Sequence, residues 1–138
     1  LDVVGLGANL PEDAVYPNCI FDVNGKSLGA SKKYQLHFEA DELPPVRAFW
    51  SLTAYNADEF LVENDLNRFA LGDRDDLRYN EDGSLDLYIQ HTATAEQQLQ
   101  NWLPIPESGV FFLTMRLYWP KEEVLNGTWK MPAIIPVE

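Results

Sequence analysis

The stretch Val110–Pro132, VFFLTMRLYWPKEEVLNGTWKMP, decides the fold, and its first half alternates with the two-residue period of a β-strand. One parity holds the large apolar side chains Phe111, Leu113, Met115, Leu117 and Trp119. The other parity holds Phe112, Thr114, Arg116 and Tyr118. We predict a strand whose first face lies in the core. An arginine on the second face needs a polar partner or water, so Arg116 is the first candidate for a role beyond folding.

A helical turn is expected directly after this strand. Pro120 ends the strand and suits the first position of a helix, so Lys121–Leu125 is predicted to form one turn. Asn126-Gly127 then ends the turn, because glycine readily adopts the left-handed conformation that follows many helices.

The rest of the chain carries mostly strand signals, which are short runs of β-branched and aromatic residues between turn residues. The predicted strands are Val15–Val23, Tyr34–Phe38, Ala48–Tyr55, Phe60–Val62, Phe69–Leu71, Leu77–Tyr79 and Leu85–His91. The last two flank the turn residues Asn80–Gly83 and predict a hairpin. About seven or eight short strands predict an all-β antiparallel sandwich or barrel with a few short helical turns.

Three connecting segments complete this interpretation. Asp22–Gly25 contains an Asn-Gly pair and predicts a tight turn. Thr94 and Gln97 have the spacing of a capping box, so Thr94–Leu99 is predicted to hold a helical turn. Asn101–Pro106 is predicted to be an extended connector.

Length and charge bound the class of protein. The chain has 138 residues, 46% of them hydrophobic, which predicts one globular domain over residues 1–138 with a helical turn or arm at 1–15. The formal net charge of -12 disfavours nucleic acid and anionic membrane surfaces, because both attract basic proteins. No apolar stretch approaches the roughly 18 residues of a membrane span. Cys19 is the only cysteine, and its apolar neighbours favour a buried, unreactive thiol.

Motifs for phosphate or metal binding are incomplete. Gly25–Ser27 resembles the end of a phosphate-binding loop, but Ile20 stands where the first glycine of that loop is needed. Asn80–Gly83 places Arg78 where a calcium loop has its first carboxylate. Asp73–Asp76 includes Arg74, which neutralises part of its charge, so a solvated acidic loop is favoured. We therefore expect no cofactor and no metal.

The two histidines are too few for a three-histidine metal site. His37 lies on the polar face of its predicted strand and is expected to be exposed. His91 ends its predicted strand, where a bond to the backbone is favoured over a role as a catalytic base.

Four blocks of sequence carry a family resemblance. In order along the chain they are FWSLTAYNADEFLVEN, NRFALGDRDDLRYNEDGSLDLYIQH, NWLP and RLYWPKEEVLNGTWKMPA. Together they resemble the family called domain of unknown function 1214, over about Tyr16 to Val137. One departure is Met131-Pro132, where a Pro-Pro pair is common in the family.

The resemblance implies a sandwich of the jelly-roll type, and it implies no established reaction. Such a domain usually forms the C-terminal part of a larger bacterial protein, often beside a companion called domain of unknown function 1254. Family members are often exported, whereas no signal segment is visible at Leu1, so bacterial cytoplasm and periplasm both stay open.

Polar and aromatic residues of these blocks form the candidate site. The set comprises Trp50, Tyr55, Asn67, Arg68, Arg74, Tyr88, Gln90, Asn101, Trp102, Arg116, Tyr118 and Trp119. Ligand-binding roles are assigned within it to Trp50, Tyr55, Tyr88, Gln90, Arg116 and Tyr118. Tyr88 and Gln90 share one parity, as do Arg116 and Tyr118, so the two pairs would form one face if their strands were neighbours. The structural alternative pairs Arg116 with Asp73, Asp75 or Asp86.

Three functions remain open from the sequence. The favoured one is a non-catalytic binding or accessory module for a small polar ligand, either a sugar or a carboxylate, or for a companion domain. The second is a hydrolase or lyase with His91 as base and Arg116 or Arg74 stabilising an anion. The third is a structural or oligomerisation domain.

Overall fold

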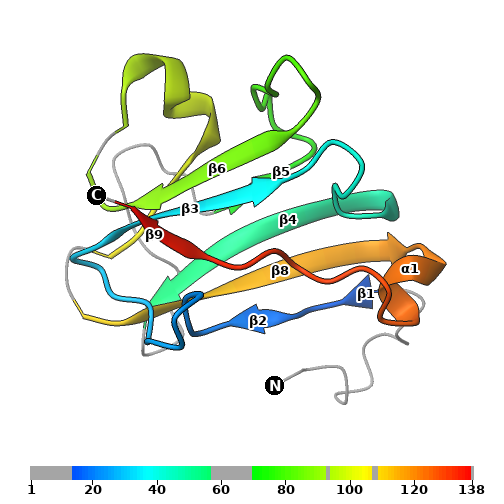
Figure 1. Cartoon of the computed structure of the whole chain (residues 1–138), viewed down its shortest axis with the longest axis horizontal. Coiled ribbons are helices and arrows are strands. Elements are labelled where there is room, and N and C mark those ends of the chain that lie inside the picture. The colour runs from blue at the N-terminus through cyan, green and yellow to red at the C-terminus, as the bar shows by residue number, and fades with distance from the viewer. Residues whose placement is uncertain (1–13, 57–69, 93, 107–108, 138) are drawn as a thin grey trace.

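The structure is a computed structural model that describes residues 14–56, 70–92, 94–106 and 109–137, and its strands form two sheets (Figure 1). The first sheet contains β1 (Ala14–Val15), β2 (Asn18–Cys19), β4 (Val46–Asn56), β5 (Ala70–Gly72) and β8 (Phe111–Pro120). Its order is β1-β8-β4-β5, and β2 pairs with β8 beside β1. All of these pairs are antiparallel.

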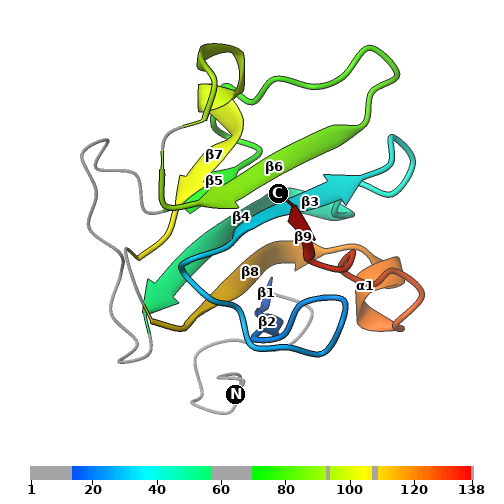
Figure 2. The same ribbon diagram turned by 60° about the vertical axis from the view of Figure 1, so that its left-hand side comes forward.

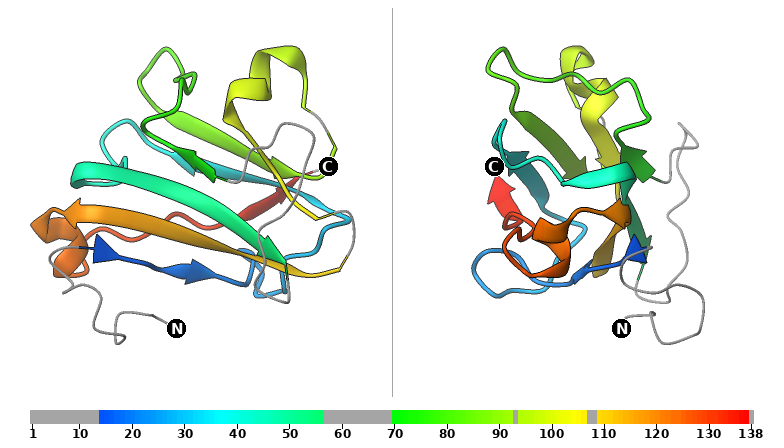
Figure 3. Two further views of the ribbon diagram at one scale, coloured as in Figure 1. Left: turned by 180° about the vertical axis from the view of Figure 1, so that it is seen from behind. Right: turned by 90° about the vertical axis from the view of Figure 1, so that its right-hand side faces the viewer.

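The second sheet has the order β7-β6-β3-β9 and faces the first sheet (Figure 2, Figure 3). Its strands are β3 (Lys33–Phe38), β6 (Leu85–Gln90), β7 (Trp102–Pro104) and β9 (Ile135–Val137). The β3–β6 and β3–β9 pairs are antiparallel, and β6–β7 is parallel. The all-β class with two sheets is therefore confirmed.

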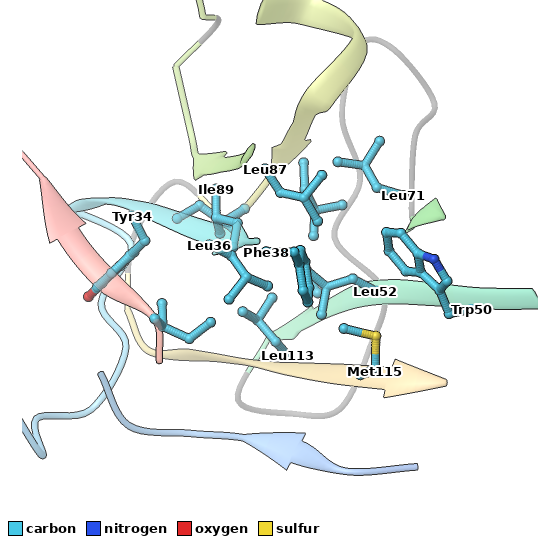
Figure 4. Close-up of a cluster of buried hydrophobic side chains, with 14 of the residues drawn as sticks. Tyr34, Leu36, Phe38, Trp50, Leu52, Leu71, Leu87, Ile89, Leu113 and Met115 are labelled. Carbon is cyan, nitrogen blue, oxygen red and sulfur yellow. The ribbon is translucent and has the colours of Figure 1, made fainter. Parts of the chain in front are cut away.

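The core lies between the two sheets and follows the two-residue alternation of the strands. From the second sheet, β3 contributes Tyr34, Leu36 and Phe38, and β6 contributes Leu85, Leu87 and Ile89. From the first sheet, β4 contributes Trp50, Leu52 and Ala54, and β8 contributes Leu113, Met115 and Leu117. Figure 4 shows side chains of both sheets pointing toward one another, among them Leu36, Phe38, Leu52, Leu113 and Met115. Each buried Leu, Ile or Phe contributes about 1.5–3 kcal/mol by leaving water, so this layer holds the sandwich together.

The strand and the helical turn predicted within Val110–Pro132 are confirmed, with one exception. The helix α1 (Glu122–Leu125) follows β8, and Gly127 has a φ of 81° just beyond it. Trp119 was predicted to share the buried face of β8, and this is wrong because the side chain is 58% exposed and its φ is 53°. The register of β4 against β8 shifts between Val46 and Phe49, so the alternation breaks opposite Trp119.

Other connections also differ from the prediction. Leu77–Tyr79 forms no strand, so the predicted hairpin is wrong, although Asn80 N still donates to Ser84 O (2.9 Å) in a tight turn. The predicted connector Asn101–Pro106 contains β7, which is buried beside β6. Local turn signals cannot reveal such a parallel pairing, because the two strands are joined by a crossover.

The predicted helical turn exists with different boundaries. It is the 3-10 helix η2 (Glu96–Asn101), whose N-cap is Ala95 and which has no side-chain cap, so the capping-box prediction is wrong. The predicted Asn-Gly turn is confirmed, since Gly25 N donates to Asp22 O (3.0 Å). The predicted strand Phe60–Val62 lies outside the described residues, as does most of the segment 1–15, of which Ala14–Val15 form β1.

Candidate functional site

Three of the six predicted ligand residues come together on the outer face of the first sheet. Arg116 and Tyr118 lie on β8, and Tyr55 lies on β4, all at the parity that points away from the core. The register pairs Phe49 with Tyr118 and Tyr55 with Phe112 across the two strands. We call this surface, made by Tyr16, Phe49, Tyr55, Phe112, Arg116 and Tyr118, the outer face.

Arg116 lies half-buried at the centre of the outer face. Its Nη1 donates to Thr53 Oγ1 (2.8 Å), and its Nη2 donates to the Tyr55 hydroxyl. The guanidinium carbon also lies 5.8 Å from the centre of the Tyr55 ring. Both partners are neutral hydroxyls, so the positive charge of Arg116 is oriented by these bonds and is not neutralised by them.

Aromatic rings border Arg116 at both ends. Toward one end of β8, Tyr118 stacks on Phe49 with ring centres 4.5 Å apart, and Tyr16 packs edge-on against Tyr118 at 6.0 Å. Toward the other end, Tyr55 stacks on Phe112 at 5.3 Å. The arrangement places one oriented cation between two aromatic pairs, which suits a small ligand with an anionic group and a flat or apolar body.

Arg74 extends the outer face toward β5. Its guanidinium carbon lies 4.1 Å from the centre of the Phe49 ring, in the geometry of a cation–π contact. Burial raises the pKa of the Tyr118 hydroxyl, and the neighbouring Tyr16 raises it further. Tyr118 is therefore a neutral hydroxyl at neutral pH, and the positive charges that lie against the rings belong to Arg74 and Arg116.

None of the three carboxylates considered as partners of Arg116 is bonded to it in the described part of the chain. Asp73 Oδ1 accepts from Trp50 N (3.2 Å), and burial raises the pKa of this carboxyl. Asp75 Oδ2 accepts from Gly72 N (2.8 Å). Asp86 belongs to β6 in the second sheet. Two of these carboxylates therefore fix the turn after β5.

The other three predicted ligand residues lie elsewhere. Trp50 is buried in the core against Phe38, with ring centres 5.9 Å apart. Tyr88 and Gln90 lie on the outward side of the second sheet, so they cannot share a face with Arg116 and Tyr118. The condition for a face shared by both pairs is therefore not met, because their strands belong to different sheets.

Gln90 and Trp102 have structural roles. Gln90 Nε2 donates to Thr92 O (2.9 Å), and Trp102 Nε1 donates to Gln90 O (2.8 Å). Asn101 bonds the carbonyls of Arg78 and Asp86 through Nδ2 at 2.8 Å each. Of the remaining set, Trp119 is exposed at the end of β8, and residues 67 and 68 lie outside the described ranges.

His91 contacts the backbone, as the sequence favoured. Its Nδ1 lies 3.1 Å from Ile105 O, beyond the end of β6 in the second sheet. Among the described residues, neither Arg116 nor Arg74 contacts it, so the base and the anion-stabilising groups of the enzyme hypothesis are not brought together. Cys19 is half-buried, and burial raises the pKa of its thiol.

One polar cluster was missed by sequence reasoning. His37 Nδ1 lies 2.6 Å from Asp86 Oδ1, and Asp86 also accepts from Gln35 Nε2 (2.8 Å) and Asn80 Nδ2 (3.0 Å). The side chain of His37 is 38% exposed, so the expectation of an exposed residue omitted its carboxylate partner. Only the register of β3 against β6 places the two residues opposite each other, and the sequence holds no local signal for it.

The described residues hold neither a cluster suited to a metal ion nor a helix suited to a membrane. No group of three or more His, Cys, Asp or Glu side chains there is arranged to hold a metal ion. None of the helices in those same residues is long and apolar enough to cross a membrane.

The chain resembles known proteins both in sequence and in fold. The family model described as "Protein of unknown function (DUF1214)" matches residues 13–122. The crystal structure of the VPA0106 protein from Vibrio parahaemolyticus is 33% identical and superposes with a TM-score of 0.86, covering 98% of this chain. This chain spans only 33% of that longer chain. No curated protein matches the sequence.

A more distant structural relative supports the fold alone. It is an uncharacterized protein from Burkholderia cenocepacia, 15% identical, with a TM-score of 0.58. The match covers 94% of this chain and 30% of that one. In both solved relatives the matching region is therefore about a third of a longer polypeptide.

Proposed function

The chain belongs to the DUF1214 family, whose function is unknown. We propose that it is a non-catalytic binding module. Its ligand is a small molecule with a carboxylate group, held against the outer face of the first sheet. The carboxylate pairs with Arg116, and the rest of the ligand lies against the aromatic rings on either side.

The observation that carries this proposal is the bonding of Arg116. Its two described partners, Thr53 and Tyr55, are neutral, and its other N–H groups have no partner among the residues that the structure describes. A half-buried cation that has no counter-ion in the described part of the chain costs free energy, which an anionic ligand lowers by charge-assisted hydrogen bonds. A planar guanidinium favours carboxylate over a neutral sugar, because it binds both oxygens at once.

The aromatic rings beside Arg116 favour a ligand that carries an apolar or flat body in addition to its anionic group. Tyr118 with Phe49, and Tyr55 with Phe112, present half-buried aromatic surface on both sides of the charge. Such surface contributes by excluding water from an apolar or flat body. We therefore expect aromatic or aliphatic carboxylates to bind more tightly than acetate or inorganic phosphate.

The test is a calorimetric and thermal-shift panel of carboxylates, neutral sugars and inorganic phosphate. We expect carboxylates to raise the melting temperature saturably, since a ligand that binds only the folded state stabilises it. Arg116→Gln should weaken binding at least about tenfold, as the loss of a charged hydrogen bond predicts. Arg47→Gln is the matched control, because it removes one exposed positive charge from the same sheet. Binding that survives Arg116→Gln, or no shift with any carboxylate, would overturn the proposal.

We infer a jelly-roll sandwich within a single domain, supported by crossovers in both sheets: β8 lies between β1 and β4, and β3 lies between β6 and β9. Both solved relatives come from bacteria, which supports a bacterial origin.

A further inference from the structure

Exposed apolar side chains lie on the loop after β2 and on the edge strand β9. Ile20, Phe21 and Val23 are 49%, 53% and 53% exposed, and Ile135 and Val137 of β9 are 46% and 38% exposed. We call these five residues the apolar strip. They are five of the nine large hydrophobic residues that are exposed within the described ranges, and they come from only two segments of the chain.

The backbone holds the two parts of the apolar strip together. Val23 N donates to Ile134 O (2.9 Å), which ties the loop after β2 to the residue before β9. Figure 2 shows that loop and β9 side by side. Ile135 and Val137 pair with Gln35 and Lys33 of β3, whose parity points away from the core. The apolar strip therefore lies outside the sandwich.

We propose that another part of a longer polypeptide, continuous with this domain, packs on the apolar strip. In the solved Vibrio relative the matching region is 33% of the chain, and in the Burkholderia protein it is 30%. Each relative therefore carries about twice as much further protein, more than enough to cover a strip of this size. The inference is independent of the ligand site, which lies on the other sheet.

Charge argues against a second copy as the occupant. Lys26, Lys32 and Lys33 are exposed beside the apolar strip, and the only acidic residue in 14–33, Asp22, is buried. A symmetric dimer would place the same patch of both copies together and bring these lysines into opposition. Two chains of net charge -12 also repel each other at long range. The partner surface is therefore apolar with acidic residues at its rim.

Pro136 argues against partner binding by strand addition. In an antiparallel strand, the backbone groups of every second residue bond the neighbouring strand, and those of the residues between them point the other way. Pro136 has no N–H to bond β3, so its backbone points to the free edge of β9. That edge consequently lacks a donor at its centre, and an added strand could not form a regular ladder. The partner packs against the side chains of the apolar strip instead.

The first test uses the solved structure of the longer Vibrio relative. In the VPA0106 structure, the positions aligned with Phe21, Val23 and Ile135 are expected to be in contact with the remaining two thirds of that chain. Solvent-exposed positions there would overturn the proposal.

The second test uses the 138-residue chain. It is expected to sediment as a monomer and to bind a hydrophobic fluorescent dye, with the signal lowered at least about twofold by a Phe21→Ser/Ile135→Ser variant of unchanged melting temperature. Leu125→Ser is the matched control, because Leu125 is 43% exposed on α1 and lies outside the apolar strip. A dimer that the double variant dissociates, or dye binding that the double variant leaves unchanged, would each overturn the proposal.

Discussion

The Nδ1 atom of His37 lies 2.6 Å from Oδ1 of Asp86, across the paired strands β3 and β6. This bond to Asp86 is the main reason that the pKa of His37 is raised, and Glu39, whose carboxylate lies 3.5 Å from Nε2, adds to it. Burial acts to raise the pKa of Asp86, but bonds from Asn80, Gln35 and His37 outweigh it and hold that pKa below its usual value.

The pair predicts a specific dependence of stability on pH. Because the pKa of His37 is higher in the folded state, its contribution is fully present below the ordinary value of about 6.5 and is lost as pH rises through the raised pKa. The contribution of Asp86 is present above its ordinary pKa and is lost as pH falls through the lowered one. The free energy of unfolding of wild type minus that of His37→Gln should therefore be larger at about pH 5.5 than at about pH 9.

The effect of the His37–Asp86 pair on the free energy of unfolding is small because the pair is partly exposed. We expect a difference below about 1 kcal/mol, measured by urea unfolding across the pH range. His91→Gln is the control, since the His91 ring faces the Ile105 carbonyl and not a carboxylate. A difference for His37→Gln that does not change with pH would show that the pair contributes no charge interaction.

Local features of this fold were predictable, and the pairings between distant segments were not. The alternation of β8 and the helical turn closed by Gly127 depend on adjacent residues, whose sterics act within a few positions. That periodicity also placed Arg116 and Tyr118 on the same side of one strand. It could not show that Tyr55 is their neighbour and Tyr88 is not, because strand order is set by contacts far apart in sequence.

Gly72 is predicted to tolerate no side chain. A Cβ built on it would lie 2.2 Å from the carbonyl oxygen of Trp50, which is backbone and cannot rotate away. We expect Gly72→Ala to lower the free energy of unfolding by about 1–3 kcal/mol, the range typical of forced overpacking with a backbone shift. Gly29→Ala is the control, because nothing lies within 4 Å of its Cβ position. Equal stability of the two variants would contradict this geometry.

Asn101 is predicted to stabilise the turn before β6 against the end of η2. It is 5% exposed, its Nδ2 donates to the Arg78 and Asp86 carbonyls, and its Oδ1 accepts from Arg78 N (2.9 Å). Asn101→Ala should cost about 2–3 kcal/mol, since it leaves backbone groups without partners. Gln100→Ala is the control, because Gln100 is the neighbouring residue and its Oε1 accepts an exposed hydrogen bond from Arg78 Nε. Losing that bond should cost less than about 0.5 kcal/mol. Thermal unfolding that ranks the two variants equally would refute the structural role of Asn101.

Trp119 allows a test of backbone strain that separates conformation from side-chain loss. Its φ of 53° is a conformation that bulky residues rarely adopt, and its side chain is 58% exposed, so the indole contributes little burial. Trp119→Gly and Trp119→Ala both remove the indole, but only glycine adopts a positive φ without steric cost. We therefore expect the glycine variant to be more stable than the alanine variant by about 1 kcal/mol, measured by urea unfolding. An alanine variant of equal or greater stability would mean that the chain does not hold this position in the left-handed region.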